Sequence, residues 1–297
     1  MRADTTGKIS LDHIYVQPDP RAYFTTLRDL DYSIPQLAKP YFTKLVREYR
    51  DATGVGEPTV VDLGCSYGIN AALLRCDLTM DDLYERYSGP GTAGLALGEL
   101  LERDRELVRA RARRGIRFVG LDASEPALSY AVRAGFLDDA VHADLEKNDP
   151  TGPQRERLAE ADLVISTGCV GYVTEKTIGR IVDAARDAGR LPWMAHFVLR
   201  MFPFDPVEET LAAAGYETVR TGGLFMQRRF ATEEERAGVL ETLAAVGVDA
   251  DGAETEGCLY ARLHISRPRG TARPTIIDMA SDRTSPGTTA PDRGSTQ

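Results

Sequence analysis

Residues 62–68 combine an acid and two glycines in one short segment, DLGCSYG, directly after the apolar run Thr59–Leu63. Gly64 and Gly68 carry no side chain, so the chain can turn sharply there and its backbone can approach a ligand closely. The helix expected to follow would present free N–H groups at its start, and Asp62 would supply an anion for a cationic ligand. The segment therefore predicts a ligand-binding turn between a strand and a helix.

The spacing of the glycines excludes one class of ligand. A dinucleotide fingerprint, GxGxxG, would place glycines at positions 64, 66 and 69. This chain has Ser66 and Ile69 instead. The turn therefore argues against a nicotinamide dinucleotide.

Three further strand ends carry polar or small residues. Asp122 closes the apolar run that begins at Phe118, and Asp144 follows the short run 140–143. The run 162–166 ends in the small residues Thr167 and Gly168. A carboxylate has acceptor sites for two donors at once, which suits a pair of hydroxyl groups. Because parallel sheets bind ligands at the carboxyl ends of their strands, these positions are expected to share one site.

Together these motifs resemble the motifs of class I S-adenosylmethionine-dependent methyltransferases, over roughly residues 58–220. The resemblance implies that Asp122 accepts both ribose hydroxyls, that Asp144 accepts the adenine amine, and that the Leu145 N–H donates to the ring. Ser66 departs from the fullest glycine pattern of the family, although its side chain is small. The cofactor-binding residues implied by the resemblance are Asp62, Gly64, Cys65, Ser66, Gly68, Asn70, Asp122, Ala123, Asp144, Leu145, Thr167 and Gly168.

Methyl transfer requires little more than a nucleophile held in line with the S–CH3 bond, so no catalytic triad is expected. Tyr172 and Glu175 follow the fourth strand and are the candidate catalytic residues, one facing the sulfonium or substrate and the other acting as a base. The alternatives are packing for Tyr172 and a favourable helix-dipole position for Glu175. Tyr23 and Tyr32 are expected either to cap the cofactor or to pack the N-terminal arm onto the domain.

Three functions remain open. The resemblance favours a methyltransferase acting at nitrogen or oxygen of a small molecule, in a secondary-metabolic setting. The first alternative uses the cofactor's aminocarboxypropyl group and cyclises S-adenosylmethionine to azetidine-2-carboxylate and methylthioadenosine. The second is a non-catalytic binding protein, because a fold does not fix a function. The cofactor is S-adenosylmethionine in all three.

Strand and helix patterns alternate from residue 59 onwards, which predicts an α/β fold with a sheet covered on both faces. The expected fold is Rossmann-like and doubly wound, with a mostly parallel seven-stranded sheet, an N-terminal helical arm and a helical insertion. The expected strands are 59–63, 116–121, 140–143, 162–166, 194–201, 216–220 and 258–266. A helix is expected to carry Pro40 in its first turn, and another to begin with Asp205 as its N-cap.

The chain divides into three expected regions. Residues 1–57 form an arm and a helix that could cap the site, and residues 58–266 form the binding domain. Asp122 lies 60 positions after Asp62, where about 20–30 would be usual, so residues 76–115 are expected to be inserted as a helical lid. Residues 267–297 are rich in polar residues, Pro and Gly and are expected to be a disordered tail.

The overall composition narrows the partners. There are 36 Lys and Arg against 45 Asp and Glu, a net charge of −9, which disfavours nucleic acid. No run of about 20 apolar residues predicts a membrane helix. Four cysteines without metal-site spacing predict reduced thiols, no metal and a cytoplasmic location. A small-molecule substrate is the expected partner.

Overall fold

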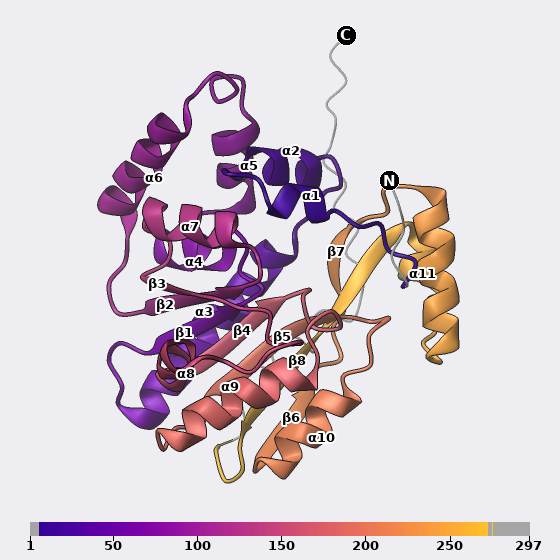
Figure 1. Cartoon of the computed structure of the whole chain (residues 1–297). Coiled ribbons are helices and arrows are strands. Elements are labelled where there is room, and N and C mark those ends of the chain that lie inside the picture. Colours follow the sequence, from indigo (N-terminus) through magenta and orange to yellow (C-terminus); the bar gives the residue numbers. More distant parts are fainter. Residues whose placement is uncertain (1–5, 273–274, 276–297) are drawn as a thin grey trace.

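The computed structural model describes residues 6–272 and residue 275 and contains one eight-stranded sheet with the order β3-β2-β1-β4-β5-β8-β6, with β7 paired to β8 (Figure 1). The first five strands of this order follow the doubly wound arrangement, in which the order reverses beside β1. The strands are β1 (Thr59–Leu63), β2 (Arg117–Asp122), β3 (Asp139–His142), β4 (Leu163–Thr167), β5 (Trp193–Leu199), β6 (Tyr216–Arg220), β7 (Phe225–Arg229) and β8 (Cys258–Pro268).

Every pairing among β1 to β5 is parallel, whereas β8 runs antiparallel to β5, β6 and β7. The mostly parallel Rossmann-like α/β fold expected from the sequence is therefore confirmed, and all seven expected strands are present within a few residues of their expected bounds. β7 is an additional strand. Its sequence, FMQRR, contains three polar residues and gives no clear apolar alternation.

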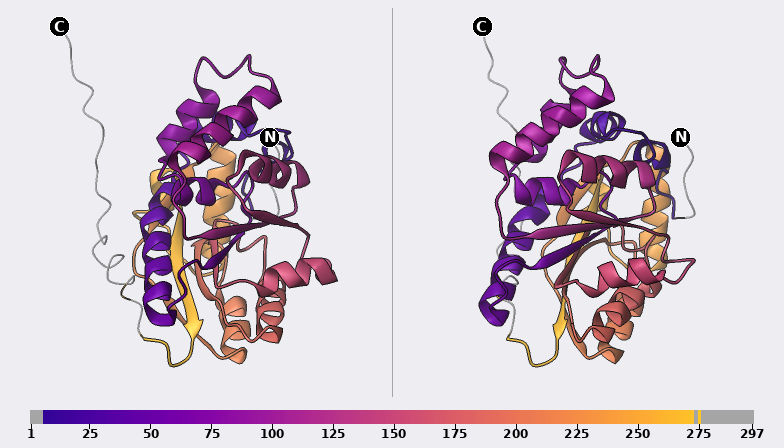
Figure 2. Two further views of the ribbon diagram at one scale, coloured as in Figure 1. Left: turned by 90° about the vertical axis from the view of Figure 1, so that its left-hand side faces the viewer. Right: turned by 60° about the vertical axis from the view of Figure 1, so that its left-hand side comes forward.

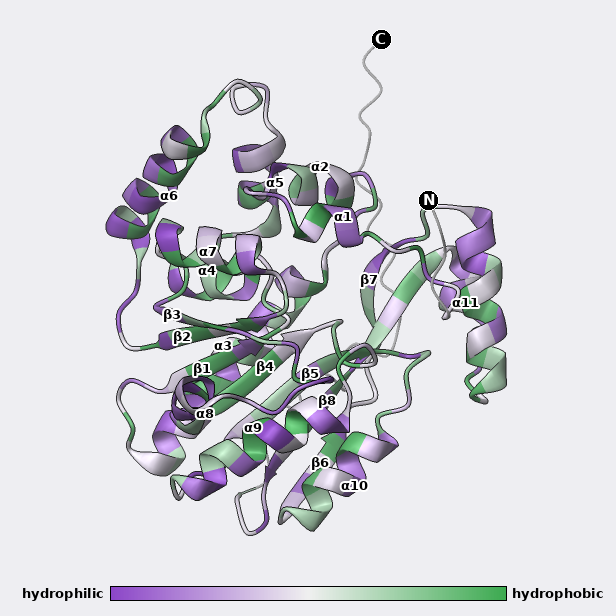
Figure 3. Ribbon diagram, viewed as in Figure 1, coloured by the Kyte–Doolittle hydropathy of each residue, from purple (hydrophilic) through white to green (hydrophobic). Residues whose placement is uncertain are grey.

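Helices cover both faces of the sheet, as Figure 2 shows from two sides. One face packs against α3 (Ile34–Thr53), α4 (Ile69–Arg75) and α7 (Glu125–Ala134). The other packs against α8 (Gly152–Ala159), α9 (Glu175–Asp187) and α10 (Asp205–Ala213). The central strands are mostly apolar (Figure 3) and buried, as expected for strands covered on both faces.

A further layer lies outside α4 and α7. It consists of the arm helices α1 (Asp12–Tyr15) and α2 (Arg21–Arg28) together with α5 (Met80–Ser88) and α6 (Leu97–Arg111) from the insertion. Buried Asp104 of α6 joins this layer, accepting hydrogen bonds from Arg86 Nε at 2.5 Å, the Tyr87 hydroxyl at 2.7 Å and the Tyr130 hydroxyl at 2.5 Å. The remaining helix, α11 (Glu233–Ala245), packs beside the start of β8.

Three local expectations require correction. Pro40 lies inside α3 because the helix begins at Ile34, where Pro35 occupies the first turn at no cost in hydrogen bonding. α10 has Phe204 rather than Asp205 as its N-cap. The expected tail begins at residue 267, but β8 continues to Pro268. Buried Arg267 lies over the Trp193 ring and pairs with Glu48, so it belongs to the folded domain. Residues 273–274 and 276–297 of that tail lie outside the described residues.

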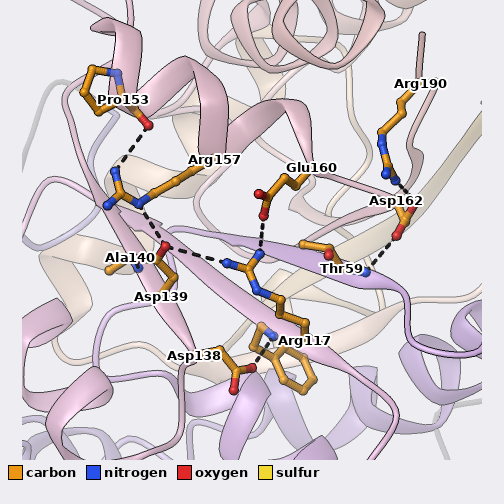
Figure 4. A network of polar contacts seen from close by, with 11 residues as sticks. Thr59, Arg117, Asp138, Asp139, Ala140, Pro153, Arg157, Glu160, Asp162 and Arg190 are labelled. Carbon is orange, nitrogen blue, oxygen red and sulfur yellow. Dashed lines mark hydrogen bonds and ion pairs between the residues drawn. The ribbon is translucent and has the colours of Figure 1, made fainter. Parts of the chain in front are cut away.

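The end of the sheet opposite the β-strand carboxyl ends is held by charged groups (Figure 4). Asp162 accepts from the Thr59 N–H at 2.9 Å and from Arg190 at 2.7 Å. Arg117 pairs with Glu160 at 2.5 Å, while Asp139 lies between Arg117 and Arg157. These contacts join the start of β1 to the start of β4, and the starts of β2 and β3 to α8 and the residue that follows it.

Two neighbouring histidines predict how stability depends on pH. His196 of β5 and His264 of β8 are buried, and burial lowers the pKa of His196 to about 4 and that of His264 to about 3. Both rings must therefore stay neutral in the folded chain. Stability is complete above the unfolded pKa of about 6.5 and falls as the pH drops towards 4, by up to about 1.4 kcal/mol per histidine per pH unit.

The measurement is urea unfolding between pH 7 and 4.5, with wild type compared with His196→Gln. The variant is expected to lose less stability than wild type over this interval, because it has one buried group fewer to charge. Equal slopes for the two chains would contradict this account of His196.

No helix in the described part of the chain is long and apolar enough to cross a membrane. Within the same residues, no three His, Cys, Asp or Glu side chains gather as they would around a metal ion.

Candidate functional site

A cavity of about 670 Å³ lies at the carboxyl ends of β1, β2, β3 and β4. Its volume is within the range of small-molecule sites. The turn after β1 forms one wall, and the N-terminal arm forms the wall opposite. Of the implied cofactor-binding residues, ten line the cavity: Gly64, Cys65, Ser66, Asn70, Asp122, Ala123, Asp144, Leu145, Thr167 and Gly168. Asp62 and Gly68 belong to the same turn after β1 but do not line the cavity.

The turn after β1 is fixed by Asp122 at the end of β2. One carboxylate oxygen accepts from the Ser66 N–H at 2.8 Å and the other from the Ser124 N–H at 2.8 Å. Ser66 adopts a left-handed backbone with φ +49°, a conformation that glycine adopts at less cost. Burial raises the pKa of Asp122, and the hydrogen bonds from Ser124 and Ser66 oppose the rise. Each oxygen retains one acceptor site for a ligand hydroxyl.

Asp62 is buried beneath the same turn. It accepts a hydrogen bond from Asn70 Nδ2 at 2.9 Å, and burial raises its pKa to about 7. The second Asp62 oxygen and Asn70 Oδ1 have no hydrogen-bond partner among the described residues, and the same holds for Ser66 Oγ. Unpartnered buried acceptors are costly, so a ligand that donates hydrogen bonds would be stabilised here.

Two glycines allow the backbone to line the cavity closely. A Cβ on Gly64, at φ +68°, would lie 2.6 Å from the Cys169 Cβ, and a Cβ on Gly168, at φ +79°, would lie 2.3 Å from Gln227 Nε2. Any side chain at these positions would displace the wall of the cavity. Cys65 and Cys169 line the cavity as thiols whose pKa burial raises, so neither is an activated nucleophile.

The β3 side of the cavity is polar. Asp144 forms an ion pair with Lys147 at 2.7 Å and is partly exposed, which leaves it accessible to a ligand amine. Glu146, which sequence reasoning missed, accepts from the Thr174 N–H and hydroxyl, each at 2.8 Å, and from the Thr177 hydroxyl at 2.6 Å. It thereby attaches this loop to the start of α9.

The arm covers the cavity with three tyrosines. Tyr23 and Tyr32, the expected cap residues, both line the cavity, as does Tyr15, which the sequence did not single out. The Tyr23 ring meets Tyr15 and Tyr32 edge-on at 5.7 and 6.3 Å between centroids. Burial raises the pKa of Tyr15 to about 12, so this hydroxyl stays protonated at neutral pH. The arm is held by Tyr67 of the β1 turn, whose hydroxyl donates to the carbonyls of Ile14 and Gln17 at 3.0 and 2.9 Å.

The expected lid role of residues 76–115 requires correction, because no residue of this insertion lines the cavity. The insertion lies behind the arm instead. Tyr84 donates to the Tyr32 carbonyl at 2.5 Å, Tyr87 stacks on Phe24 at 4.7 Å, and Arg21 reaches the Leu95 carbonyl at 2.9 Å. Arm residues 8–32 thus form the cover, and the insertion is its support.

The candidate catalytic residues separate in the structure. Tyr172 lines the cavity, is 44% exposed and packs edge-on against Phe202 at 5.2 Å. Glu175 does not line the cavity and is the first residue of α9, which is the position of the helix-dipole alternative. His196 is buried and bonded through Nδ1 to the Ser166 hydroxyl at 2.8 Å, away from the cavity.

Two further lining residues, Gln227 and Arg228, come from β7. Neighbouring residues of a regular strand point to opposite faces. The register of β7 shifts between Met226 and Arg228, and this irregularity allows both side chains to reach the cavity. No sequence signal marked them, because β7 itself was not expected.

No family model matches the chain, and no curated protein matches it. Among solved structures, magnesium protoporphyrin IX methyltransferase from Synechocystis is similar at 12% identity and a TM-score of 0.37, over 78% of this chain and 80% of that one. A methyltransferase from Geobacter sulfurreducens, solved with S-adenosyl-L-homocysteine, is 14% identical with a TM-score of 0.33. The match covers 76% of this chain and 91% of that one. Geranyl diphosphate C-methyltransferase from Streptomyces coelicolor is 10% identical with a TM-score of 0.38. The match covers 76% of this chain and 79% of that one.

Because all three TM-scores are below 0.5, these likenesses carry no argument about this chain. The fold is defined here by the strand order, by the reversed β8 between β5 and β6, and by the turn that follows β1. These features define a Rossmann-like α/β fold with a mostly parallel sheet.

Proposed function

We propose that the chain binds S-adenosylmethionine in this cavity and transfers its methyl group to a small molecule. The observation that carries the proposal is the order in which polar residues follow one another along the cavity, from the end of β3 to the end of β4. Asp122 offers two free acceptor sites for ribose hydroxyls, Asp144 lies one strand further out for the adenine amine, and Asn70 and Thr167 lie towards β4 for the methionyl end. Strand order alone brings these residues together.

The unpartnered acceptors fit such a ligand. Asn70 lines the cavity, its Oδ1 lacks a donor within the described residues, and the methionyl ammonium carries three N–H donors. Asp62 lies behind Asn70 and would act on the ammonium through its charge. When bound, the sulfonium supplies an electrophilic methyl group. The chain's own residues would orient the cofactor, while the arm tyrosines exclude water and present ring faces to the positive charge.

A proton-release measurement tests the role of Asp62. Since its pKa is about 7 in the free chain, roughly half of the molecules carry the proton at neutral pH. A cation bound nearby lowers this pKa, so binding at pH 7 should release about half a proton, and affinity should fall as the pH drops below 7. Calorimetry in buffers of different ionisation enthalpy measures this release. Asp62→Asn should release clearly less, and equal release by both chains would contradict the assignment.

A second reaction is favoured by the size of the cavity and its closure by the arm. A volume of about 670 Å³ suits a single drug-sized ligand. Cyclisation needs no second substrate: the cofactor's α-amine attacks the carbon γ to its carboxyl, the bond from that carbon to sulfur breaks, and its electrons stay on sulfur. The amine loses a proton, and the products are azetidine-2-carboxylate and methylthioadenosine.

One assay separates these reactions. The purified chain is incubated with S-adenosylmethionine alone and then with candidate small-molecule acceptors, and products are identified by mass spectrometry. S-adenosylhomocysteine that forms only with an acceptor supports methyl transfer. Methylthioadenosine formed without any acceptor, at a rate that Asp122→Asn lowers, would replace methyl transfer by cyclisation. Binding without either product would support the non-catalytic alternative.

A further inference from the structure

The β7 wall of the cavity is the part that the proposed function does not use. Gln227 and Arg228 both line the cavity because of the register shift at residues 226–228. Irregularities of this kind are frequent beside functional sites, where they re-aim a side chain. Both residues are almost fully buried, at 4% and 2% exposure, so their polar atoms face the cavity or other protein groups rather than bulk water.

The hydrogen-bond donors of Arg228 are only partly used. Nη1 donates to the Arg229 carbonyl at 2.8 Å and to Glu235 at 2.9 Å, and Nη2 donates to Glu235 at 2.5 Å. A guanidinium has five N–H groups. Within residues 6–272 and 275, no acceptor contacts Nε–H or the second N–H of Nη2. One edge of the planar group is therefore available to a ligand.

The charge of Glu235 is shared among several donors. Its two oxygens also accept from the Ile9 N–H at 2.9 Å and the Ala231 N–H at 2.8 Å. Burial raises the pKa of Glu235, but Arg228 and the Ala231 and Ile9 N–H groups together outweigh burial and leave this pKa below its ordinary value. The carboxylate is thus stabilised by neutral backbone donors as well as by Arg228.

The rest of the cavity disfavours an anion. Its described lining includes four carboxylates, Asp12, Asp122, Asp144 and Glu146. The cations are Lys8 and Arg228, and Lys8 lies on the arm with its ammonium 5.2 Å from the centre of the Tyr172 ring. Beside Arg228, Gln227 Oε1 is a buried acceptor without a partner among the described residues. The donor edge of Arg228 lies next to the acceptor Gln227 Oε1, and this pair matches a ligand in which a carboxylate has an ammonium beside it.

We propose that Arg228 binds a ligand carboxylate in the cavity, with Gln227 accepting from an adjacent ammonium. This inference rests on the proposed function, because the carboxylate could belong to S-adenosylmethionine or to an acidic acceptor. Arginine suits the role since its planar fork binds carboxylates through two parallel hydrogen bonds. Arg228 is then a positioning residue that fixes the methionyl end of the site or selects the acceptor.

The first experiment compares S-adenosylmethionine with its decarboxylated analogue by calorimetry. Wild type is expected to bind the analogue about 50-fold more weakly, because charge-assisted hydrogen bonds are lost. The test variant is Arg228→Gln with Glu235→Gln, which removes both charges and avoids an unpaired buried carboxylate. Arg228→Lys, which keeps the charge and loses the fork, is expected to fall in between. Thermal unfolding of each variant verifies that it folds.

Benzoate provides the second arm, titrated into the free chain and into the chain saturated with S-adenosylhomocysteine. Loss of discrimination in the double variant supports the inference, with the cofactor as the source of the carboxylate. In a second outcome, wild type binds S-adenosylmethionine and its decarboxylated analogue equally, and benzoate binding requires Arg228. That result supports the inference and assigns the carboxylate to an acidic acceptor. If neither effect depends on Arg228, the inference is overturned.

Failure of the proposed function gives a different result. Wild type would then bind neither S-adenosylmethionine nor S-adenosylhomocysteine. Benzoate binding to the free chain would still decide the inference: dependence on Arg228 supports it, and independence overturns it.

Discussion

Asp122→Asn is expected to weaken binding of S-adenosylmethionine by about 100-fold, or about 2.7 kcal/mol, which is the scale of hydrogen bonds to a charged group. The carboxylate holds the Ser66 and Ser124 N–H groups and keeps two acceptor sites for the ribose. The amide retains one oxygen and presents an N–H group where an acceptor is needed. Calorimetry measures the loss directly.

Two controls show where that effect arises. Asp139→Asn makes the same change on β3 at the opposite end of the sheet, beside Arg157, and should leave affinity unchanged. Methylthioadenosine retains the ribose but lacks the amino-acid group. Asp122→Asn should therefore weaken the binding of methylthioadenosine by a factor similar to that for S-adenosylmethionine. Affinity for S-adenosylmethionine within threefold of wild type would show that Asp122 does not bind the ribose.

Asp104→Asn is expected to destabilise the fold by about 3 kcal/mol, because Arg86, whose side chain is 17% exposed, would keep a partly buried charge without its partner. Asp104 is fully buried and accepts from three side chains, on α5 and α7. For a domain of this size the loss corresponds to a fall in Tm of roughly 10 °C. Urea and thermal unfolding measure it.

The matched control lies on the same helix. Glu102→Gln removes an exposed carboxylate that pairs with Arg109, and exposed pairs contribute little, so stability should change by less than about 0.5 kcal/mol. A comparable loss in the two variants would show that the buried network is not what holds the insertion. Because the insertion supports the arm, Asp104→Asn should also weaken cofactor binding.

The sequence predicted the features that depend on local rules. The apolar run before Asp62 and the glycines at 64 and 68 predicted β1 at its observed bounds and a helix, α4, directly after the turn. The carboxyl ends of parallel strands lie at one edge of the sheet, so the sequence alone places Asp122, Asp144 and Thr167 in one site.

The remaining features depend on tertiary packing. Arm and insertion were both plausible covers, and the choice depended on which one Tyr67 holds against the cavity. Arg228 carries no motif, and its place in the cavity follows from a register shift in a strand without apolar alternation. Glu146 resembles any surface acid until Thr174 and Thr177 are seen to donate to it.

The most direct test of the central claim is a calorimetric titration of the full chain with S-adenosylmethionine, followed by competition with S-adenosylhomocysteine and with NAD. One site per chain is predicted, with S-adenosylhomocysteine displacing the ligand and NAD having no effect, because Ser66 and Ile69 replace the dinucleotide glycines. Absence of S-adenosylmethionine binding, or its displacement by NAD, would contradict the account.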